Sequence, residues 1–415
     1  MNKKFLSFLL CLVMIAISAC VLTACQENDE NTYEITVWVG EGTKEFTEQY
    51  IKKFNEDNEW GVKFNATVEM VSEGRAAGDA ISKQQSAADI FCFAQDQLAR
   101  LVQSGLLAPL NKASQDAIVA NSDEESIVAT KIGSTIRAFP MTADNGFFMF
   151  YDKRVIKEDS VGSLEKIIAD CESAGKKFSM NLTKDGGGWY ASSFFYATGC
   201  VSEWTTDENG KFTDYNDTFD SAKGIIALKG MQKLLQSGCH QDSAEVSDFT
   251  AAISSAVVVS GIWGYNAAKT ALGNNLGVAP LPSFNVEGKD YQLVSYLGRK
   301  LMGVREQSDA YRALYLQKLA MYLTSKEVQL ARFNEVGWGP SDKNAQQNSD
   351  VAANIALKAL AESKTVMQGQ YPTNWWAQVQ LMTGNAKSST SEDVSLQILL
   401  KTYSDKLPSL KIEDK

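Results

Sequence analysis

The sequence predicts an α/β protein with two lobes, and three observations lead to this prediction. Strand-like and helix-like stretches alternate from about residue 34 to residue 110, which is typical of a parallel sheet with crossover helices. The 415 residues exceed the usual size of one domain. No low-complexity linker separates two halves, so we expect the chain to cross between the lobes more than once.

The first strand–helix–strand unit lies near the amino end. Glu34–Val39 predicts a strand, and Gly40–Gly42 predicts the turn after it. The helix that follows has apolar residues on one face, at Phe46, Tyr50, Ile51 and Phe54. Apolar residues alternate from Val62 to Met70, which predicts a second strand. A helix from about Arg75 to Ser86 leads to the third strand.

The stretch Ala87–Leu110 combines a strand, a polar turn and a helix. Ile90–Phe93 is a short run of β-branched and aromatic residues that suits a strand buried on both faces. Asp96 ends the run, a helical pattern follows, and Gly105 stands where a C-cap glycine belongs. Ligands of open α/β sheets bind beyond the carboxyl ends of the strands. We therefore expect four side chains at a binding rim, namely Phe93, Gln95, Asp96 and Gln97.

This set of side chains is suited to a sugar ring. The C–H face of a sugar packs on an aromatic ring, while its hydroxyls need partners that accept and donate hydrogen bonds. A structural role is the alternative: Phe93 would belong to the core and Asp96 would cap the helix.

Strands and helices alternate through the rest of the chain as well. Ile136–Met141 and Gly146–Tyr151 predict two strands around a turn at Thr142–Asn145. Thr324–Glu327 fits a capping box for the helix after it. Further helices are expected at about residues 164–174, 221–237, 248–255 and 309–323, and another opens at 372–376.

The amino end predicts export and a lipid anchor. Residues 1–24 begin with a basic segment, continue with an apolar run and end in Leu-Thr-Ala before Cys25. This resembles the lipobox of bacterial lipoproteins, whose cysteine receives diacylglycerol and becomes the first residue. Cys20 is a second candidate, but polar residues follow Cys25 as a tether at 25–32. A transmembrane anchor is the alternative, although the apolar stretch only approaches the roughly 18 residues that a span needs.

Charge and residue usage exclude several classes of function. The formal net charge of −10 argues against nucleic acid as a partner, because phosphate binding needs a basic face. His240 is the only histidine and no CxxC occurs, so neither a metal site nor a cofactor is expected. Four cysteines remain outside the signal and anchor, at Cys92, Cys171, Cys200 and Cys239. They allow two disulfides in three connectivities, or simple packing in the core.

Half of the eight tryptophans occupy positions that suit a cleft. They lie at turns beside glycine or proline, or at a helix start, whereas core tryptophans more often lie within an element. These four are Trp189, Trp263, Trp338 and Trp375. Core packing is the alternative for each.

Several segments together resemble the extracellular solute-binding proteins of ABC importers, and the maltose/maltodextrin-binding subgroup most closely. They occur in the family's order over nearly all of residues 33–410. The segments are ITVWVGEGTKEF, KKFNE, ADIFCFAQDQLARLVQSGLLAPL, AFPMTADNGFFMFYDK, VVSGIWGY, GVAPLPSF and YLTSKEVQL.

The resemblance implies a periplasmic-binding-protein-like fold, with two α/β lobes, hinge crossings and a ligand cleft between the lobes. The first lobe would comprise 33–142 and 292–338, and the second 146–288 and 342–412. The crossings would fall near Asp144, Lys289 and Gly339. Closure of the cleft would desolvate the ligand and produce the form that a membrane permease recognises.

The resemblance also implies ligand contacts by position. Phe93 stands where the family places a tryptophan, Asp96 matches an acidic partner, and Gln97 replaces an arginine. Glu41, and either Asp144 or Asn145, correspond to further cleft acids. The stacking aromatics correspond to Trp189 or Tyr190, Trp263 and Trp375, with Tyr265, Trp338 and Trp376 as neighbours able to reach the cleft.

The function that follows is capture of maltose or maltooligosaccharides outside the membrane and delivery to an ABC permease. Lipid on Cys25 would confine the protein to the membrane surface, and a monomer is expected. Another oligosaccharide, a polyol or a peptide is the first alternative, because Phe93 and Gln97 depart from the family pattern. A surface glycoside hydrolase is the second alternative, but the chain carries none of the common catalytic motifs, so we expect no enzyme.

Overall fold

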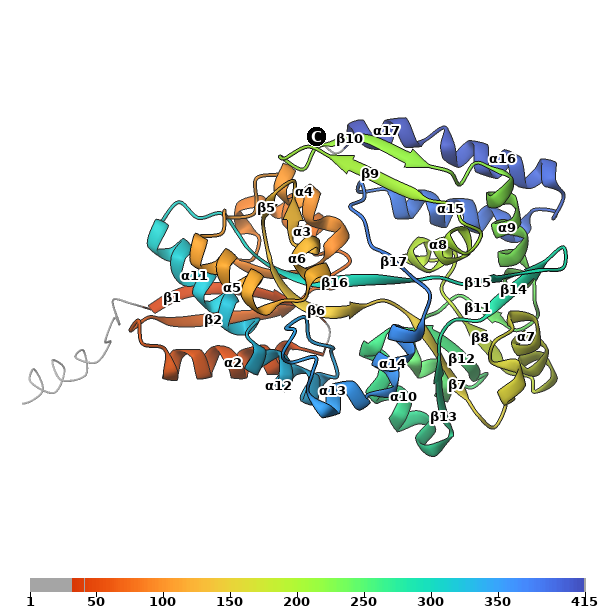
Figure 1. Ribbon diagram of the computed structural model, residues 1–415, viewed down its shortest axis with the longest axis horizontal. Coiled ribbons are helices and arrows are strands. Elements are labelled where there is room, and N and C mark those ends of the chain that lie inside the picture. Colours follow the sequence, from red (N-terminus) through yellow and green to blue (C-terminus); the bar gives the residue numbers. More distant parts are fainter. Residues whose placement is uncertain (1–31, 41, 414–415) are drawn as a thin grey trace, which may run out of the picture.

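The computed structural model describes residues 32–40 and 42–413, which form two lobes side by side (Figure 1). The predicted signal segment, the anchor Cys25 and the predicted site residue Glu41 lie outside the described residues. The mixed α/β architecture predicted from the sequence is confirmed. Within the described ranges, no helix is long and apolar enough to cross a membrane.

The first lobe is built on a six-stranded sheet with the order β17-β16-β3-β1-β2, in which β6 also pairs with β16. Strand β1 is parallel to β2 and β3, whereas β16 is antiparallel to β3 and β6. The strands are β1 (Thr32–Val39), β2 (Lys63–Met70), β3 (Ile90–Ala94), β6 (Phe139–Asn145), β16 (Ser295–Val304) and β17 (Thr365–Met367). The helices of this lobe include α2 (Lys44–Asp57), α3 (Ala76–Lys83), α4 (Leu98–Gln103), α5 (Lys112–Asn121), α6 (Glu124–Ala129), α11 (Ala310–Leu323) and α12 (Lys326–Val336). The short strands β4 (Lys131–Ile132) and β5 (Thr135–Ile136) pair with each other.

Strand β3 is buried along its whole length, as its sequence predicts. Phe91 and Phe93 belong to one hydrophobic core and Ile90 and Cys92 to another, because successive side chains of a strand point to opposite faces. The strand ends in a single 3₁₀ turn, Gln95–Gln97, followed directly by α4. The predicted strand–turn–helix sequence is therefore confirmed.

The second lobe is built on a five-stranded sheet with the order β11-β8-β12-β7-β13. Its strands are β7 (Phe148–Asp152), β8 (Lys177–Ser179), β11 (His240–Gln241), β12 (Ser255–Ser260) and β13 (Leu276–Ala279). The helices include α7 (Leu164–Ser173), α8 (Gly187–Ala197), α9 (Ala222–Leu235), α10 (Tyr265–Leu272), α13 (Ser349–Ala353), α14 (Ile355–Glu362), α15 (Trp375–Ser388), α16 (Asp393–Ser404) and α17 (Leu407–Glu413). Two hairpins complete it, β9 (Ser202–Thr206) with β10 (Phe212–Asp217) and β14 (Ser283–Val286) with β15 (Lys289–Gln292).

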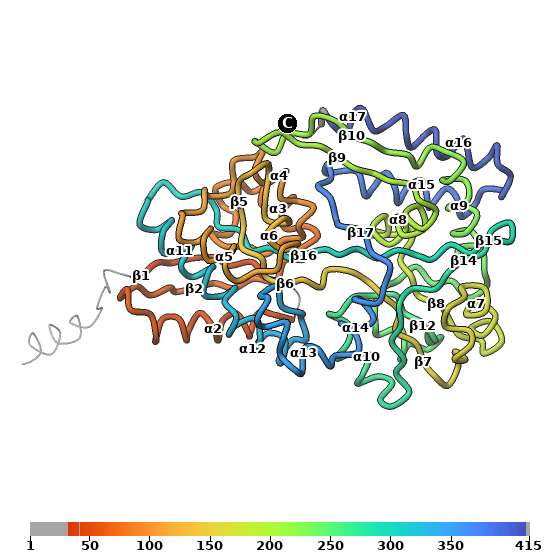
Figure 2. The backbone as a smooth tube through the Cα atoms, in the orientation of Figure 1, coloured from red at the N-terminus to blue at the C-terminus, as the bar shows by residue number. Residues whose placement is uncertain are grey.

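The chain passes between the sheets along strands that lie side by side, which can be followed in Figure 2. Strand β6 leaves the first sheet and the chain enters the second at β7, and β16 later returns to the first. Thr142 of β6 also bridges to Pro340, which brings a third passage beside the other two. A Cβ atom at Gly146 would collide with the carbonyl oxygen of Tyr296, so the close approach of these segments requires glycine there.

The structure corrects four local expectations. Thr142–Asn145 is not a turn but the end of β6, held extended by pairing with β16. Lys289 lies in the hairpin strand β15, and the strand that returns to the first sheet begins only at Ser295. Residues 248–255 form no α-helix, because a short 3₁₀ helix at Val246–Thr250 gives way to β12. Ser325, not Thr324, caps α12, accepting a hydrogen bond from the Val328 N–H at 3.4 Å.

Candidate ligand-binding site

Four aromatic side chains from four elements meet where β16 passes the second lobe. Trp189 lies on α8, Trp263 in the 3₁₀ turn Ile262–Gly264, Tyr296 on β16 and Trp376 on α15. We call these four residues the aromatic cluster. Its ring centroids lie 6.3 Å apart for Trp189 and Trp263, and 5.8 Å apart both for Trp189 and Tyr296 and for Tyr296 and Trp376.

The aromatic cluster combines three partly exposed tryptophans with the buried Tyr296. Tyr296 is 1% exposed and stacks on Trp189 with an interplanar angle of 8°. The three tryptophans are half-buried, so each keeps part of its ring available. Rigid aromatic faces of this kind bind the C–H side of a sugar ring with little loss of side-chain entropy.

Close packing of two helix starts places Trp189 beside Trp376. A Cβ atom at Gly188 would collide with the carbonyl oxygen of Trp376, so glycine lets α8 and α15 begin almost in backbone contact. The next residue along α8 is Trp189. Gly188 therefore acts on the site through helix packing.

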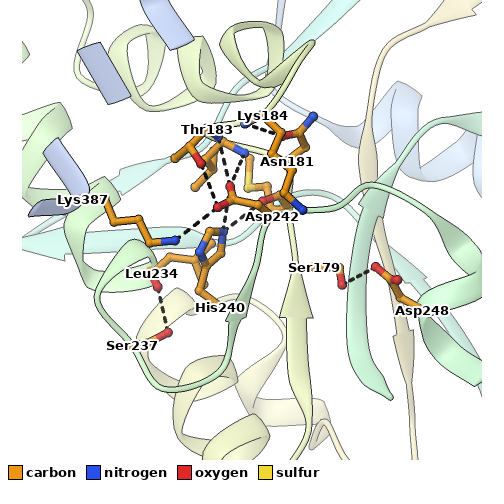
Figure 3. Close-up of polar contacts among 12 residues, drawn as sticks. Ser179, Asn181, Thr183, Lys184, Leu234, Ser237, His240, Asp242, Asp248 and Lys387 are labelled. Carbon is orange, nitrogen blue, oxygen red and sulfur yellow. Dashed lines mark hydrogen bonds and ion pairs between the residues drawn. The ribbon is translucent and has the colours of Figure 1, made fainter. Parts of the chain in front are cut away.

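A polar network around Asp242 fixes the loop that leads into α8 (Figure 3). The Asp242 carboxylate accepts hydrogen bonds from the backbone N–H of Leu182 at 3.1 Å and of Thr183 at 3.0 Å. It also accepts one from the Thr183 hydroxyl at 2.8 Å, and Lys387 of α15 lies 3.3 Å away. Burial alone would raise the pKa of Asp242, but neighbouring His240 and these hydrogen bonds hold it below its usual value.

In the part of the chain that the structure describes, three buried oxygens without a partner belong to Asp96, to the adjacent Gln95 and to Gln368, which Gln95 contacts. The Trp376 indole donates to Asp96 Oδ2 at 2.9 Å, while Asp96 Oδ1 has no hydrogen-bond partner among the described residues. Gln95 donates to the backbone oxygen of Gln368 at 2.6 Å, yet the side-chain oxygens of both glutamines are unpaired in this part of the structure. An unsatisfied buried polar atom costs roughly 1–3 kcal/mol. Their concentration here is what a site for a hydroxyl-rich ligand requires.

The ionisation of Asp96 is opposed by its surroundings. The carboxyl is buried, and burial raises its pKa above the usual value although the Trp376 indole and the charge of Arg100 act in the opposite direction. Asp144 behaves similarly: burial raises its pKa, while Lys300 and a hydrogen bond from the Gly339 N–H oppose the shift. In both carboxyls the Oδ1 atom has no hydrogen-bond partner among the described residues.

A buried lysine joins the cluster to the first lobe. The Lys300 ammonium lies 4.9 Å from the ring centroid of Trp263 and 3.8 Å from that of Trp338. It also lies 3.2 Å from Glu73 Oε1, which balances its charge. Lys300 is 4% exposed, so this cation–π and ion-pair arrangement is shielded from water.

Two residues predicted to stack on a ligand are enclosed in the cores, which corrects those assignments. Phe93 is 0% exposed and its ring packs against Phe91, because β3 is covered on both faces. Trp375 is also 0% exposed; it stacks on Tyr371 at 4.1 Å, and its indole donates to the Tyr403 hydroxyl at 2.8 Å. Of the two adjacent tryptophans, it is Trp376 that belongs to the aromatic cluster.

The remaining predicted residues surround the cluster at varying distance. The Tyr190 ring lies 5.0 Å from that of Trp189. Trp338 contacts the ammonium group of Lys300, which also lies over the ring of Trp263. Asn145 pairs with β16 beside it. Tyr265 packs against a separate hydrophobic core that also contacts Trp263. The Gln97 side chain is engaged within the first lobe. Its amide oxygen accepts a hydrogen bond from the Ala77 N–H at 3.0 Å, and its amide nitrogen donates one to the Glu73 carbonyl at 2.7 Å.

Sequence analysis missed four residues of this region, namely Glu73, Tyr296, Lys300 and Gln368. One signal was present: Arg299-Lys300 is a basic pair inside the otherwise mainly apolar run of β16. A lysine in a fully buried strand needs a specific partner, which marks it as a candidate functional residue.

Two cavities of the described residues are lined by residues outside the aromatic cluster. A cavity of about 210 Å³ is lined by α5, the α11–α12 junction and residues near Asp342, and one of about 450 Å³ lies beside Leu281 and Lys364. Neither is lined by a predicted ligand-binding residue. In the described ranges, no group of three or more His, Cys, Asp or Glu residues could hold a metal ion.

Comparison with known proteins shows the family of the chain. Residues 49–359 match the family model described as bacterial extracellular solute-binding protein. The maltotriose-binding protein of Pyrococcus abyssi (strain GE5 / Orsay) is 23% identical over 222 residues, which cover 52% of this chain and 46% of that protein. The alignment thus spans about half the length of this relative.

Solved structures match over almost the whole chain. A maltodextrin-binding protein from L. casei BL23, solved without ligand, has a TM-score of 0.72 and 22% identity, covering 92% of this chain and 99% of that chain. An ABC transporter solute-binding protein from Thermotoga lettingae TMO, bound with α-D-tagatose, has a TM-score of 0.72 and 16% identity, covering 91% and 99%. These matches confirm the two-lobed fold.

Proposed function

Because the chain belongs to the bacterial extracellular solute-binding proteins, we propose that it captures a maltose- or maltooligosaccharide-type sugar between its lobes. It would deliver this sugar to the permease of an ABC transporter. The observation that carries the proposal is the aromatic cluster beside the unpaired oxygens of Asp96, Gln95 and Gln368. Stacking faces next to unsatisfied polar atoms match a ligand with apolar ring faces and many hydroxyls.

The family membership also settles the class of activity. Its members bind solutes outside the cytoplasm and are not enzymes, so the prediction that the chain has no catalytic activity is confirmed.

We propose further that lipid on Cys25 anchors a monomer at the membrane. The proposed lobes are 33–142 with 292–338, and 146–288 with 342–412, although β17 of the last segment pairs with β16 in the sheet of the first lobe.

A second candidate is the same transport role for a different sugar or small polar solute. It is favoured by Gln97, whose amide is engaged within the first lobe, and by the enclosed ring of Phe93. These two positions therefore leave Asp96 and Trp376 as the main contacts at this end of the site. Tagatose, the ligand of the Thermotoga lettingae protein, is a suitable probe for this candidate.

Isothermal titration calorimetry with maltotriose and tagatose tests the proposal. A micromolar ligand releases about 8 kcal/mol, and at 100 times its Kd it stabilises the protein by about 2.7 kcal/mol, which raises the melting temperature. We expect maltotriose to bind and Trp263→Ala to weaken its binding at least tenfold. Trp60→Ala is the matched control, because Trp60 is 38% exposed on the first lobe.

Each outcome has a definite meaning. Binding of maltotriose that depends on Trp263 but not on Trp60 supports the proposal. Binding of tagatose alone supports the second candidate. Binding that Trp263→Ala leaves unchanged contradicts the site.

A further inference from the structure

Two buried thiols of the second lobe lie close together although they are 68 positions apart in the chain. Cys171 lies in the last turns of α7, and Cys239 directly precedes β11. They are 0% and 2% exposed, and both are free thiols in the structure. The Cys171 sulfur lies 3.9 Å from the carbonyl oxygen of Lys177, and the Cys239 sulfur lies 3.9 Å from that of Ile168 in the helix of Cys171.

The backbone brings the two side chains together. The Lys176 N–H donates to the Cys171 carbonyl at 2.8 Å, and the Phe178 N–H donates to the Cys239 carbonyl at 2.9 Å. The backbones of both cysteines are therefore hydrogen-bonded to one short segment, residues 176–178, which enters β8. Their approach does not depend on flexible side chains.

The direction of the side chains agrees with this contact. The Cys239 sulfur lies 3.9 Å from the carbonyl oxygen of Ile168, one helical turn before Cys171. A helical side chain leans toward the N-terminus of its own helix, over the preceding turn. The Cys171 side chain therefore covers the spot at which the Cys239 sulfur points.

We propose that Cys171 and Cys239 form a disulfide in the exported protein. The two S–H bonds break, one S–S bond forms, and two electrons and two protons pass to an oxidant. The oxidant is a disulfide, either of an exported thiol oxidase or of a small molecule such as oxidised glutathione, which becomes two thiols. Disulfides persist in extracellular proteins, and this family is extracellular.

The two thiols also affect each other's ionisation. Their interaction lowers the pKa of Cys239 and raises the pKa of Cys171. Thiol–disulfide exchange proceeds through attack by a thiolate and a mixed disulfide, which the second thiol of the pair resolves.

The other two described cysteines have different neighbours. The Cys92 sulfur lies 3.5 Å from the sulfur of Met141, and the Cys200 sulfur lies 3.5 Å from the Thr198 hydroxyl. Neither neighbour is a thiol. Cys92 and Cys200 therefore serve as internal controls.

The disulfide would affect the ligand site because the loop that it closes carries part of that site. The loop from Cys171 to Cys239 contains α8 and Trp189, and closing it reduces the freedom of the unfolded chain. Asp242, which fixes the loop before α8, follows Cys239 by three residues. Figure 3 shows Ser237, His240 and Asp242, which lie on either side of Cys239 in the chain.

The test is thiol mapping of the mature protein after equilibration or refolding with oxidised and reduced glutathione. Free thiols are alkylated, the protein is digested without reductant, and the peptides are identified by mass spectrometry. We expect a Cys171–Cys239 linked pair, with Cys92 and Cys200 alkylated. Cys171→Ser and Cys239→Ser should each remove the link, whereas Cys200→Ser should retain it.

A second measurement does not depend on the folding of these variants. The oxidised wild-type protein should melt about 2 °C or more above the dithiothreitol-treated protein. Alkylation of all four cysteines after oxidative refolding, or a link that includes Cys92 or Cys200, would overturn the proposal. Neither result affects the proposed sugar binding, which the calorimetry tests separately.

Discussion

At Asp96, ligand binding and stability make opposite demands on one carboxyl group. Its Oδ1 atom is buried without a partner, and burial raises its pKa above the usual value. An acid whose folded pKa exceeds its unfolded pKa stabilises the fold at low pH, and this contribution is lost as pH rises through the folded value. Ionisation of Asp96 therefore costs stability as pH rises.

We predict that Asp96→Asn gains stability relative to wild type as pH rises from 4 to 7. The amide oxygen can still accept from Trp376, but it no longer ionises. The affinity for sugar should fall about tenfold or more, because a hydrogen bond to a charged group contributes roughly 1.5–3 kcal/mol. Thermal unfolding across this pH range and calorimetry at pH 7 measure the two effects.

Asp116→Asn is the control for this pair of measurements, because Asp116 is exposed on α5 and pairs with Lys112 one turn away. It should change neither property by much. A stability difference for Asp96→Asn that stays constant from pH 4 to 7 would show that the carboxyl does not titrate as described.

The tryptophan pair 375–376 shows what residue types can and cannot predict. The sequence indicates that a helix begins at these residues and that one of them faces the site. Adjacent helical residues point about 100° apart, and the choice between them depends on how α15 sits against α8 and α16. Only the packing shows that Trp375 belongs to the core and Trp376 to the aromatic cluster.

At the scale of elements, the contact between α8 and α15 organises the site. We predict that Gly188→Ala destabilises the protein by about 1–3 kcal/mol, because its methyl group would collide with the Trp376 carbonyl. The helices must separate to relieve the collision, which moves Trp189 away from Trp376. Sugar affinity should therefore fall as well. Urea unfolding and calorimetry measure these changes.

Gly384→Ala is a matched control on α15 itself. A Cβ atom there has open space, with Thr183 as its nearest neighbour at 4.0 Å. Because alanine favours a helix by up to about 1 kcal/mol over glycine, this variant should be slightly more stable than wild type. Equal destabilisation by both substitutions would rule out a special role for the helix contact.

Elements that rest on local patterns were predictable, and elements that rest on distant pairing were not. Strand β3 and helix α2 follow from short apolar runs and spacing. The end of β6 looks like a turn in the sequence, because Thr142–Asn145 is polar and carries turn residues. It is a strand because β16, more than 150 positions away, and the segment at Gly339 and Pro340 supply its pairing partners. Local propensity contains no information about such a partner.

At the scale of the whole molecule, the strands β6 and β16 connect the two lobes, and β16 also contributes residues to the ligand site. Tyr296 and Lys300 of β16 contribute directly to the aromatic cluster and its surroundings. We predict that Gly146→Ala lowers the free energy of unfolding by about 1–3 kcal/mol, because its methyl group would collide with the Tyr296 carbonyl. Chemical denaturation provides the measurement.

The control is Gly162→Ala, at a position where an added Cβ atom meets nothing within 4 Å. Its unfolding free energy should remain within about 0.5 kcal/mol of wild type. If Gly146→Ala is equally neutral, the crossing segments are not as closely packed as the structure indicates.

The most direct test of the central claim is a crystal structure of the protein with maltotriose. The account predicts sugar rings packed on Trp263 and Trp376, with a hydroxyl hydrogen-bonded to the Asp96 carboxylate. Sugar bound in either of the two cavities lined by residues outside the aromatic cluster, with the cluster untouched, would contradict it.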